Sequence, residues 1–159
     1  AQHFEKAASI VETDFHSCGM LTSVYDVLGN QERMLWAARM AVSRAEQVIA
    51  QDPTNGAALA TGAAGLAILG ERDRFQDFAD RAQLVDPDNM IMQYNFACAL
   101  ARHLKDYEGA LDLLERRLEN ISPTLFRGVL NDPDLEGMRE LPRFKAMIEK
   151  ANQRLSVGG

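Results

Sequence analysis

Two similar helix stops divide the centre of this chain. Asp52-Pro53-Thr54-Asn55 is followed by Asp86-Pro87-Asp88-Asn89, so the two prolines lie 34 positions apart (87 − 53). Between these stops, an Ala/Gly-rich stretch (56–69), a break at Gly70 and a charged amphipathic stretch (73–85) predict two helices joined by a turn. A helical pair of this period cannot bury its apolar face alone, so the spacing predicts a solenoid of stacked units.

Neighbouring stretches continue the pattern on both sides and predict one all-α domain over residues 1–159. The predicted parts are the second helix of an incomplete unit (4–13), a unit with an elongated second helix (15–53), a regular unit (56–87), a further unit (90–122) and an irregular C-terminal helical cap (123–155). The unit at 15–53 is seven residues longer than the regular unit (39 against 32). Seven residues make about two helical turns, so the elongated helix keeps the same buried face.

Local signals mark where several helices begin or end. Asp14 is placed to cap the helix that starts at Phe15, and Gly29 is placed to end that helix in a left-handed conformation. Three further helix starts are predicted in the C-terminal cap, where proline fits the first helical position: Ser122-Pro123, Asp132-Pro133 and Leu141-Pro142.

Apolar positions at helical spacing predict which side chains form the core. The first helix of the elongated unit places Cys18, Leu21, Tyr25 and Leu28 on one face, and the second helix of the regular unit places Phe75, Phe78, Ala79, Ala82 and Leu84 on another. Glycine inside a helix costs about 1 kcal/mol relative to alanine, so the glycines of 56–69 predict a close approach of neighbouring helices. One extra residue near Lys105 is needed to keep 90–122 in register.

Composition narrows the classes of partner and compartment. The chain carries 17 Lys+Arg against 23 Asp+Glu, a formal charge of −6, and no Lys/Arg-rich run, so we expect neither nucleic acid nor a membrane surface as a partner. No apolar stretch is long enough to span a bilayer. Cys18 and Cys98 lack disulfide or metal spacing and occupy apolar helical positions, which predicts buried free thiols and a cytoplasmic protein.

The pattern resembles tetratricopeptide (TPR) repeats in residue type as well as in period. The matching residues are Leu21, Tyr25, Ala41, Ala45 and Pro53, then Leu59, Ala63, Leu66, Phe75, Ala79, Ala82 and Pro87, then Phe96, Ala97, Leu100, Ala110 and Leu114, with Ser122 in place of the closing proline. The resemblance covers residues 4–122. It implies a right-handed α-α superhelix whose first helices line a concave surface.

The C-terminal part is similar to the ending of multidomain bacterial signalling proteins. The segments that carry this similarity are 94–100, 110–115 and 132–144. In such proteins a TPR region follows a class III adenylate/guanylate cyclase or a protein kinase domain. The catalytic sequence of neither domain is present here, so the similarity implies a signalling context and no activity.

The histidines, cysteines and acidic residues do not form a catalytic or metal-binding pattern. His3, His16 and His103 lack metal-ligand spacing with one another and with the cysteines. His16, Ser17 and Cys18 are consecutive, and consecutive helical residues do not face one another. The phosphate-binding motif G-x-x-x-x-G-K-[ST] is missing from the sequence. We therefore expect no catalysis, no cofactor and no bound metal.

The TPR resemblance implies a groove lined by the first helices. Register predicts that its residues are His16, Met20, Ser23, Ala60, Thr61, Ala64, Ile68, Ile91, Tyr94, Asn95, Cys98 and Arg102. Only Asn95 and Arg102 could bind a terminal carboxylate, so we expect an apolar groove for a helix or extended peptide with small apolar anchors. The N-terminal segment of the protein itself is an alternative occupant. Trp36 and Met40 are candidates for a separate interface, and a core position is the alternative for Trp36.

Three functions fit these observations. The first is a non-catalytic protein–protein interaction scaffold that binds a partner peptide or helix. The second is a regulatory or oligomerising domain of a bacterial nucleotide cyclase or kinase, with homo-oligomers formed through Trp36 and the elongated helix. The third is a small-molecule-binding regulatory domain lined by residues such as Met20, Ala60 and Tyr94.

Overall fold

A computed structural model describes residues 1–157 of the chain. Within that range the chain folds into helices and contains no β-strand, which confirms the all-α prediction. Its contacts separate it into two compact units, Ala1–Asn89 and the residues from Met90 onward. No helix in the described range is both long enough and apolar enough to cross a membrane.

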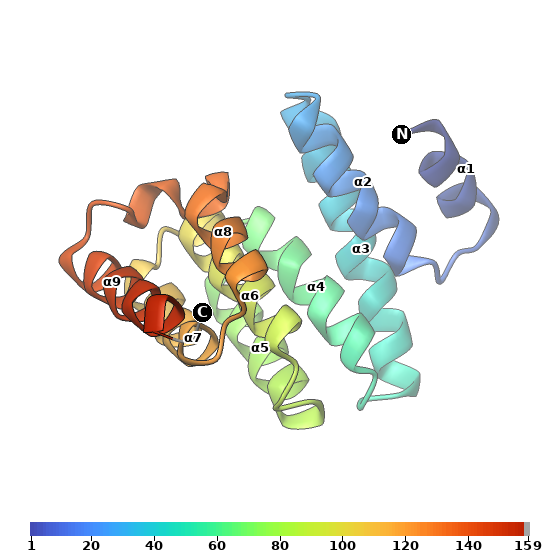
Figure 1. Cartoon of the computed structure of the whole chain (residues 1–159). Coiled ribbons are helices and arrows are strands. Elements are labelled where there is room, and N and C mark those ends of the chain that lie inside the picture. The colour runs from blue at the N-terminus through green and yellow to red at the C-terminus, as the bar shows by residue number, and fades with distance from the viewer. Residues whose placement is uncertain (158–159) are drawn as a thin grey trace. The chain divides into compact units, whose positions relative to one another are not determined.

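The first unit contains five consecutive helices. They are α1 (Gln2–Ile10), α2 (Phe15–Val27), α3 (Gln31–Gln51), α4 (Gly56–Ile68) and α5 (Arg72–Val85). Each of these helices packs against the next one in the chain (Figure 1). In addition, α2 contacts α4. The predicted elongation of the second helix is confirmed, because α3 has 21 residues against 14 in α5.

Side-chain caps and glycine turns set the ends of these helices. Asp14 accepts a hydrogen bond from the backbone N–H of Ser17 (2.8 Å), which confirms the predicted cap of α2. Asn55 caps α4 in the same way through Ala58 N–H (3.0 Å). After α2 the chain turns at Gly29, whose φ of +64° is the left-handed conformation that the sequence predicts there.

The glycines of α4 allow the close helix packing that the sequence predicts. A Cβ at Gly62 would lie 2.8 Å from the Phe78 ring of α5, and a Cβ at Gly65 would lie 2.8 Å from Val42 Cγ2 of α3. Neither gap admits a methyl group, so glycine is required for α4 to approach both neighbours. The Ala/Gly-rich sequence of this helix therefore reflects packing between α3, α4 and α5.

The second unit begins with a helical pair and continues into the irregular segment. Its elements are α6 (Met90–Ala99), the π-helix η1 (Leu100–Leu104), α7 (Tyr107–Glu119), α8 (Pro123–Asn131), the 3-10 helix η2 (Pro133–Met138) and α9 (Pro142–Val157). The three predicted helix starts at proline are confirmed by α8, η2 and α9. Phe96, Leu111, Leu114, Leu135 and Met138 are almost fully buried and form much of the core of this unit.

The extra residue near Lys105 is accommodated at the end of α6. The last turn widens from an α-helix to the π-helix η1, which takes up one more residue per turn. Lys105 then adopts a left-handed conformation with φ of +54°, and its neighbour Asp106 caps α7 through Gly109 N–H (3.0 Å). The register of the pair is thereby kept.

Two predicted core residues are exposed instead. Leu28 is 66% exposed because α2 ends at Val27 and the chain turns away at Gly29. Leu84 is 83% exposed, because it lies two residues after buried Ala82, about 200° further round α5. The predicted burial of both cysteines is confirmed, and both are free thiols.

Candidate functional site

In the first unit, the predicted groove residues lie on α2 and α4, which contact each other. Thr61 lies so close to Gly19 that a Cβ at Gly19 would be 2.8 Å from Thr61 Cγ2. The exposed members are His16, Met20, Ser23 and Ala64, and the half-buried members are Ala60, Thr61 and Ile68. The fold therefore brings these residues onto two adjacent helices, and we call them the α2/α4 surface.

The α2/α4 surface is uncharged, in contrast to the neighbouring helices. No residue of α4 is charged, and within α2 only Asp26 is. The charged residues are concentrated in α3 (Glu32, Arg33, Arg39, Arg44, Glu46) and in α5 (Arg72, Asp73, Arg74, Asp77, Asp80, Arg81). Apart from buried Arg44, water solvates the charged faces of α3 and α5 well, whereas exposed surface without charge is the kind that protein partners cover.

In the second unit, the predicted groove residues lie on α6 and η1, and three of them are engaged by the chain itself. Tyr94 donates a hydrogen bond from its hydroxyl to Asp132 Oδ2 (2.6 Å), and Arg102 forms an ion pair with Asp134. Cys98 is buried beside them, whereas Ile91 and Asn95 are exposed. The segment that contacts Tyr94 and Arg102 is the C-terminal one, so these two side chains do not line an open groove within this unit.

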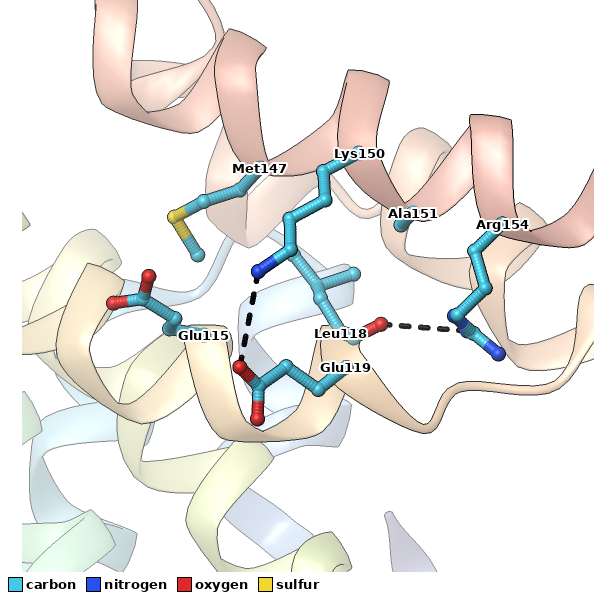
Figure 2. Close-up of a pocket in the computed structure, with 7 residues that line it drawn as sticks. All are labelled: Glu115, Leu118, Glu119, Met147, Lys150, Ala151 and Arg154. Carbon is cyan, nitrogen blue, oxygen red and sulfur yellow. Dashed lines mark hydrogen bonds and ion pairs between the residues drawn. The ribbon is translucent and has the colours of Figure 1, made fainter.

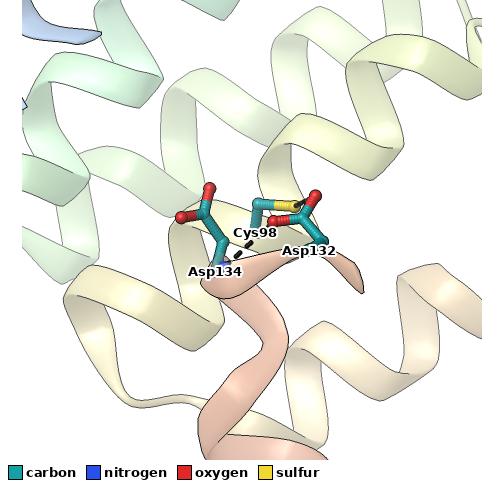
Figure 3. Close-up of side chains that lie close together, drawn as sticks. All are labelled: Cys98, Asp132 and Asp134. Carbon is teal, nitrogen blue, oxygen red and sulfur yellow. Dashed lines mark hydrogen bonds between the residues drawn. The ribbon is translucent and has the colours of Figure 1, made fainter. Parts of the chain in front are cut away.

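The contacts of η2 create a cluster of possible metal ligands. Figure 3 shows Cys98 beside Asp132 and Asp134, and their ligand atoms lie within 4.8 Å of one another. Cys98 Sγ is 3.9 Å from Asp132 Oδ2. A thiolate and two carboxylates are able to bind a divalent cation. Whether this cluster can do so depends on the protonation of the thiol and on the partners that the carboxylates already have.

The groups of this cluster are already satisfied by internal contacts. Burial, together with the negative charge of the Asp132 carboxylate, raises the pKa of the Cys98 thiol to about 12. Burial and the hydrogen bond to Asp132 also raise the pKa of Tyr94. A thiol that stays protonated at neutral pH is a poor nucleophile and a poor metal ligand. Since Tyr94 and Arg102 hold the two carboxylates, the arrangement fastens η2 to α6 and η1.

Arg117 supports this cluster from α7. Its guanidinium lies 4.6 Å from the centre of the Tyr94 ring, and Nη1 donates to the Met90 carbonyl (2.7 Å). Among the described residues, Arg117 Nε finds no hydrogen-bond partner. The cation is therefore held mainly by the Tyr94 ring and by the Met90 carbonyl at the start of α6.

A pocket of about 250 Å³ lies between α7 and α9. It is lined by Glu115, Leu118, Glu119, Met147, Lys150, Ala151 and Arg154 (Figure 2). Lys150 pairs with Glu119 (3.9 Å), and Arg154 donates to the Leu118 and Ile121 carbonyls (3.4 and 2.8 Å). The volume is below the range typical of small-molecule sites, and these two cations already have partners, so the pocket is a weak candidate for a ligand site.

Trp36 and Met40, the two predicted interface residues, differ in exposure. Trp36 is 41% exposed, and the Arg33 guanidinium lies 5.9 Å from its ring centre. Met40 is partly buried and packs against the cluster formed by Ala8, Cys18 and their neighbours. Trp36 therefore remains available for contact on α3, whereas Met40 contributes to the packing of the first unit.

Two features of the structure were not found by sequence reasoning. The first is Arg44, which is buried and donates to backbone carbonyls of α1. Its position three residues after Ala41, on the apolar face of α3, could have indicated this burial. Asp132 was expected only at the start of a helix, before Pro133. Asp132 does cap η2 through Asp134 N–H (2.9 Å), but both also bind side chains more than 30 positions away.

These features define an all-helical protein with an uncharged surface on α2 and α4 and an internally satisfied polar cluster in its second unit. No protein-family model matches the chain, and no curated protein matches it.

Proposed function

We propose that this chain is a non-catalytic scaffold of the TPR type that binds a peptide or helix of a partner protein through the α2/α4 surface. The observation that carries the proposal is the charge distribution of the first unit. Exposed, uncharged side chains gather on α2 and α4, whereas charged residues are concentrated in α3 and α5. A partner would exclude water from the uncharged surface without stripping water from a charge.

The TPR assignment is supported by the order of the helices and by the period. Helical pairs α2–α3, α4–α5 and α6–α7 follow one another along the chain, and each pair packs together. The prolines that close two of these pairs lie 34 positions apart (87 − 53), the length of a TPR repeat. In this proposal the pairs form a right-handed superhelix, and α8, η2 and α9 form its polar cap.

The chemistry of the surface suggests the chemistry of the partner. Ala60 and Ala64 are small, and Met20 is flexible and apolar, so they leave room for short apolar side chains. A terminal carboxylate is a poor candidate, because α4 carries no charged residue and the one charged residue of α2 is the acidic Asp26. We therefore expect a helix or extended peptide anchored by small apolar residues.

The test begins with the selection of peptides that bind the whole chain from a random library. Binding of a selected peptide is then measured by calorimetry to the parent chain, to Ala64→Glu and to Ala50→Glu. Both alanines are exposed in the first unit, but Ala50 lies on α3, outside the α2/α4 surface. We expect Ala64→Glu to weaken binding at least about tenfold, since it buries a charge, and Ala50→Glu to have little effect. Equal binding to all three proteins would contradict the proposal.

One observation favours a second candidate function, a regulatory domain that self-associates. Trp36 is the one tryptophan of the chain and is 41% exposed, and aromatic residues of this kind often anchor interfaces. In this case sedimentation velocity of the parent chain would show a concentration-dependent dimer, and Trp36→Ala would abolish it. A monomer at all concentrations would exclude this candidate and leave the scaffold proposal intact.

A further inference from the structure

Helix α1 is attached to the first unit through little apolar area. Of its nine residues only Ala8 is buried, at 5% exposure, and Phe4 packs partly against α2 and α3. Ile10 and Val11, at its end, are both exposed. α2 buries five residues by comparison. A helix of this length is marginal in water when it is not docked, so its order depends on these few contacts.

Polar contacts supply much of the remaining attachment. Glu5 accepts hydrogen bonds from the Tyr25 hydroxyl and from Arg33 Nη1 (2.9 Å). Arg44 donates to the Ala8 carbonyl (2.7 Å) and to the Val11 carbonyl (3.1 Å). Water can replace these partners when the helix leaves, so breaking each contact costs much less than the bond itself is worth.

Beneath α1 lies an apolar seat formed by α2 and α3. The seat consists of Cys18, Leu21, Tyr25, Ala37 and Ala41, with Met34 and Met40 packed against it. α2 and α3 contact each other and both contact α4, so their packing does not depend on α1. Figure 1 shows α1 beside α2, joined to it by the turn that precedes Phe15.

We propose that α1 is a reversible cover. It detaches from the seat while the rest of the first unit stays folded, and the seat then binds a helix of a partner protein that shares the features of α1. These features are an apolar residue followed by an acidic one (Phe4, Glu5) and a small residue three positions later (Ala8), with carbonyl groups at the helix end that accept hydrogen bonds from Arg44. Arg33 recognises the carboxylate and Arg44 recognises the helix end. The partner half of this proposal extends the proposed scaffold function, whereas the detachment of α1 does not rest on it.

Detachment is tested by alkylation of Cys18, which is fully buried with α1 in place. The whole chain is treated with a thiol reagent at urea concentrations below its unfolding transition, and modification of Cys18 and of Cys98 is measured separately by mass spectrometry of peptides. Opening of α1 alone exposes little surface, so we expect the Cys18 rate to depend only weakly on urea. We also expect Glu5→Ala to raise that rate about tenfold and to leave the Cys98 rate unchanged. A Cys18 rate that rises as steeply with urea as global unfolding would overturn the proposal.

Binding in trans is tested with the variant Ala8→Asp, in which a buried carboxylate displaces α1 from the seat. The probe is a synthetic peptide of residues 1–12, and the control is the same peptide with Glu5→Ala and Ala8→Asp. A short linker gives α1 an effective concentration of about 1 mM, so the parent peptide at that concentration should occupy the empty seat. We expect it to slow Cys18 alkylation at least about fivefold and the control peptide to have no effect.

If Ala8→Asp loses helical circular dichroism beyond the contribution of α1, the double variant Phe4→Ser, Glu5→Ala replaces it. Failure of the parent peptide to protect Cys18 in a folded variant would overturn the partner half of the proposal. That outcome is distinct from failure of the scaffold function, because binding at the α2/α4 surface is measured independently with Ala64→Glu.

Discussion

Arg44 links two helices through the backbone. It is 8% exposed, and its guanidinium donates to the carbonyls of Ala8, Val11 and Asp14 at the end of α1 and the start of α2. Arg154 binds the end of α7 in a similar way, through the Leu118 and Ile121 carbonyls. In both cases a cation donates to carbonyl groups at or just beyond the C-terminal end of a helix, and Arg44 also reaches the start of the next one.

Replacing Arg44 should therefore destabilise the first unit. Arg44→Met keeps much of the apolar stem but leaves buried carbonyls without a donor, so we expect the free energy of unfolding to fall by about 1–3 kcal/mol. The control is Arg39→Met, because Arg39 is exposed on the same helix and its loss should cost less than about 0.5 kcal/mol. Urea denaturation measures both, and equal effects of the two substitutions would contradict the role of Arg44.

Asp14 should make stability depend on pH. Partial burial raises the pKa of its carboxyl, but hydrogen bonds from Ser17 and the charge of Arg44 outweigh this, and the net shift is downward. A pKa that is lower in the folded state means that Asp14 adds stability above its unfolded pKa, and that this contribution is lost as pH falls through the folded pKa.

Asp14→Asn keeps a capping side chain but removes the titration. We expect the stability difference between the parent chain and this variant to be largest above about pH 5 and to shrink as the pH falls below about 4. Urea denaturation across this pH range provides the measurement. A difference that stays constant from pH 3 to pH 7 would show that the Asp14 charge makes no contribution.

At the scale of helices, the packing of α4 explains its glycines. A Cβ at Gly65 would meet Val42 Cγ2 at 2.8 Å and the Ala38 carbonyl oxygen at 3.1 Å, and the backbone atom cannot move aside. Gly128 in α8 is also helical, but a Cβ there would have no atom within 4 Å. The same substitution should therefore have opposite effects at the two sites.

We expect Gly65→Ala to lower the free energy of unfolding by about 1–3 kcal/mol through overpacking, despite the higher helix propensity of alanine. Gly128→Ala should raise it by up to about 1 kcal/mol, because only the propensity changes. Thermal unfolding of both variants gives the comparison. Stabilisation by Gly65→Ala would mean that α3 and α4 do not pack as closely as described.

Helix bounds could be predicted well from the sequence because their signals are local. The Asp14 cap, the Gly29 turn and the prolines of the C-terminal segment each act within a few residues, and all three signals are confirmed. The prediction that Leu84 is buried was wrong, because it rested on the apolar character of leucine and not on the direction in which this residue points around the helix axis. Local patterns therefore fix elements better than they fix which face of an element is buried.

The polar contacts of the second unit could not be predicted in the same way. Tyr94 meets Asp132 across 38 positions and Arg102 meets Asp134 across 32, and no sequence spacing marks such pairs. The placement of the predicted residues on α2 and α4 could be predicted from the 34-residue period, because this period assigns equivalent positions to the first helices of 15–53 and 56–87. The residues of the α2/α4 surface could therefore be predicted from periodicity, whereas the side-chain pairs of the second unit, which depend on single non-local contacts, could not.

At the scale of the whole molecule, charge distinguishes the α2/α4 surface from the charged faces of α3 and α5. The chain has a formal charge of −6, yet no residue of α4 is charged. Binding at the α2/α4 surface should then depend little on salt. We expect the Kd of a selected peptide to change less than about twofold between 50 and 500 mM NaCl, because screening acts mainly on exposed charges. Calorimetry at several salt concentrations measures this, and a tenfold loss of affinity would indicate a charged site.

The location of the bound peptide tests the central claim most directly. Amide and methyl NMR spectra of the isotope-labelled chain are recorded during titration with a selected peptide. We predict that the largest shifts fall on α2 and α4, with Met20, Ala60 and Ala64 among them, and that the charged face of α5 is unaffected. Shifts confined to α5 or to the second unit would contradict the assignment of the α2/α4 surface as the binding site.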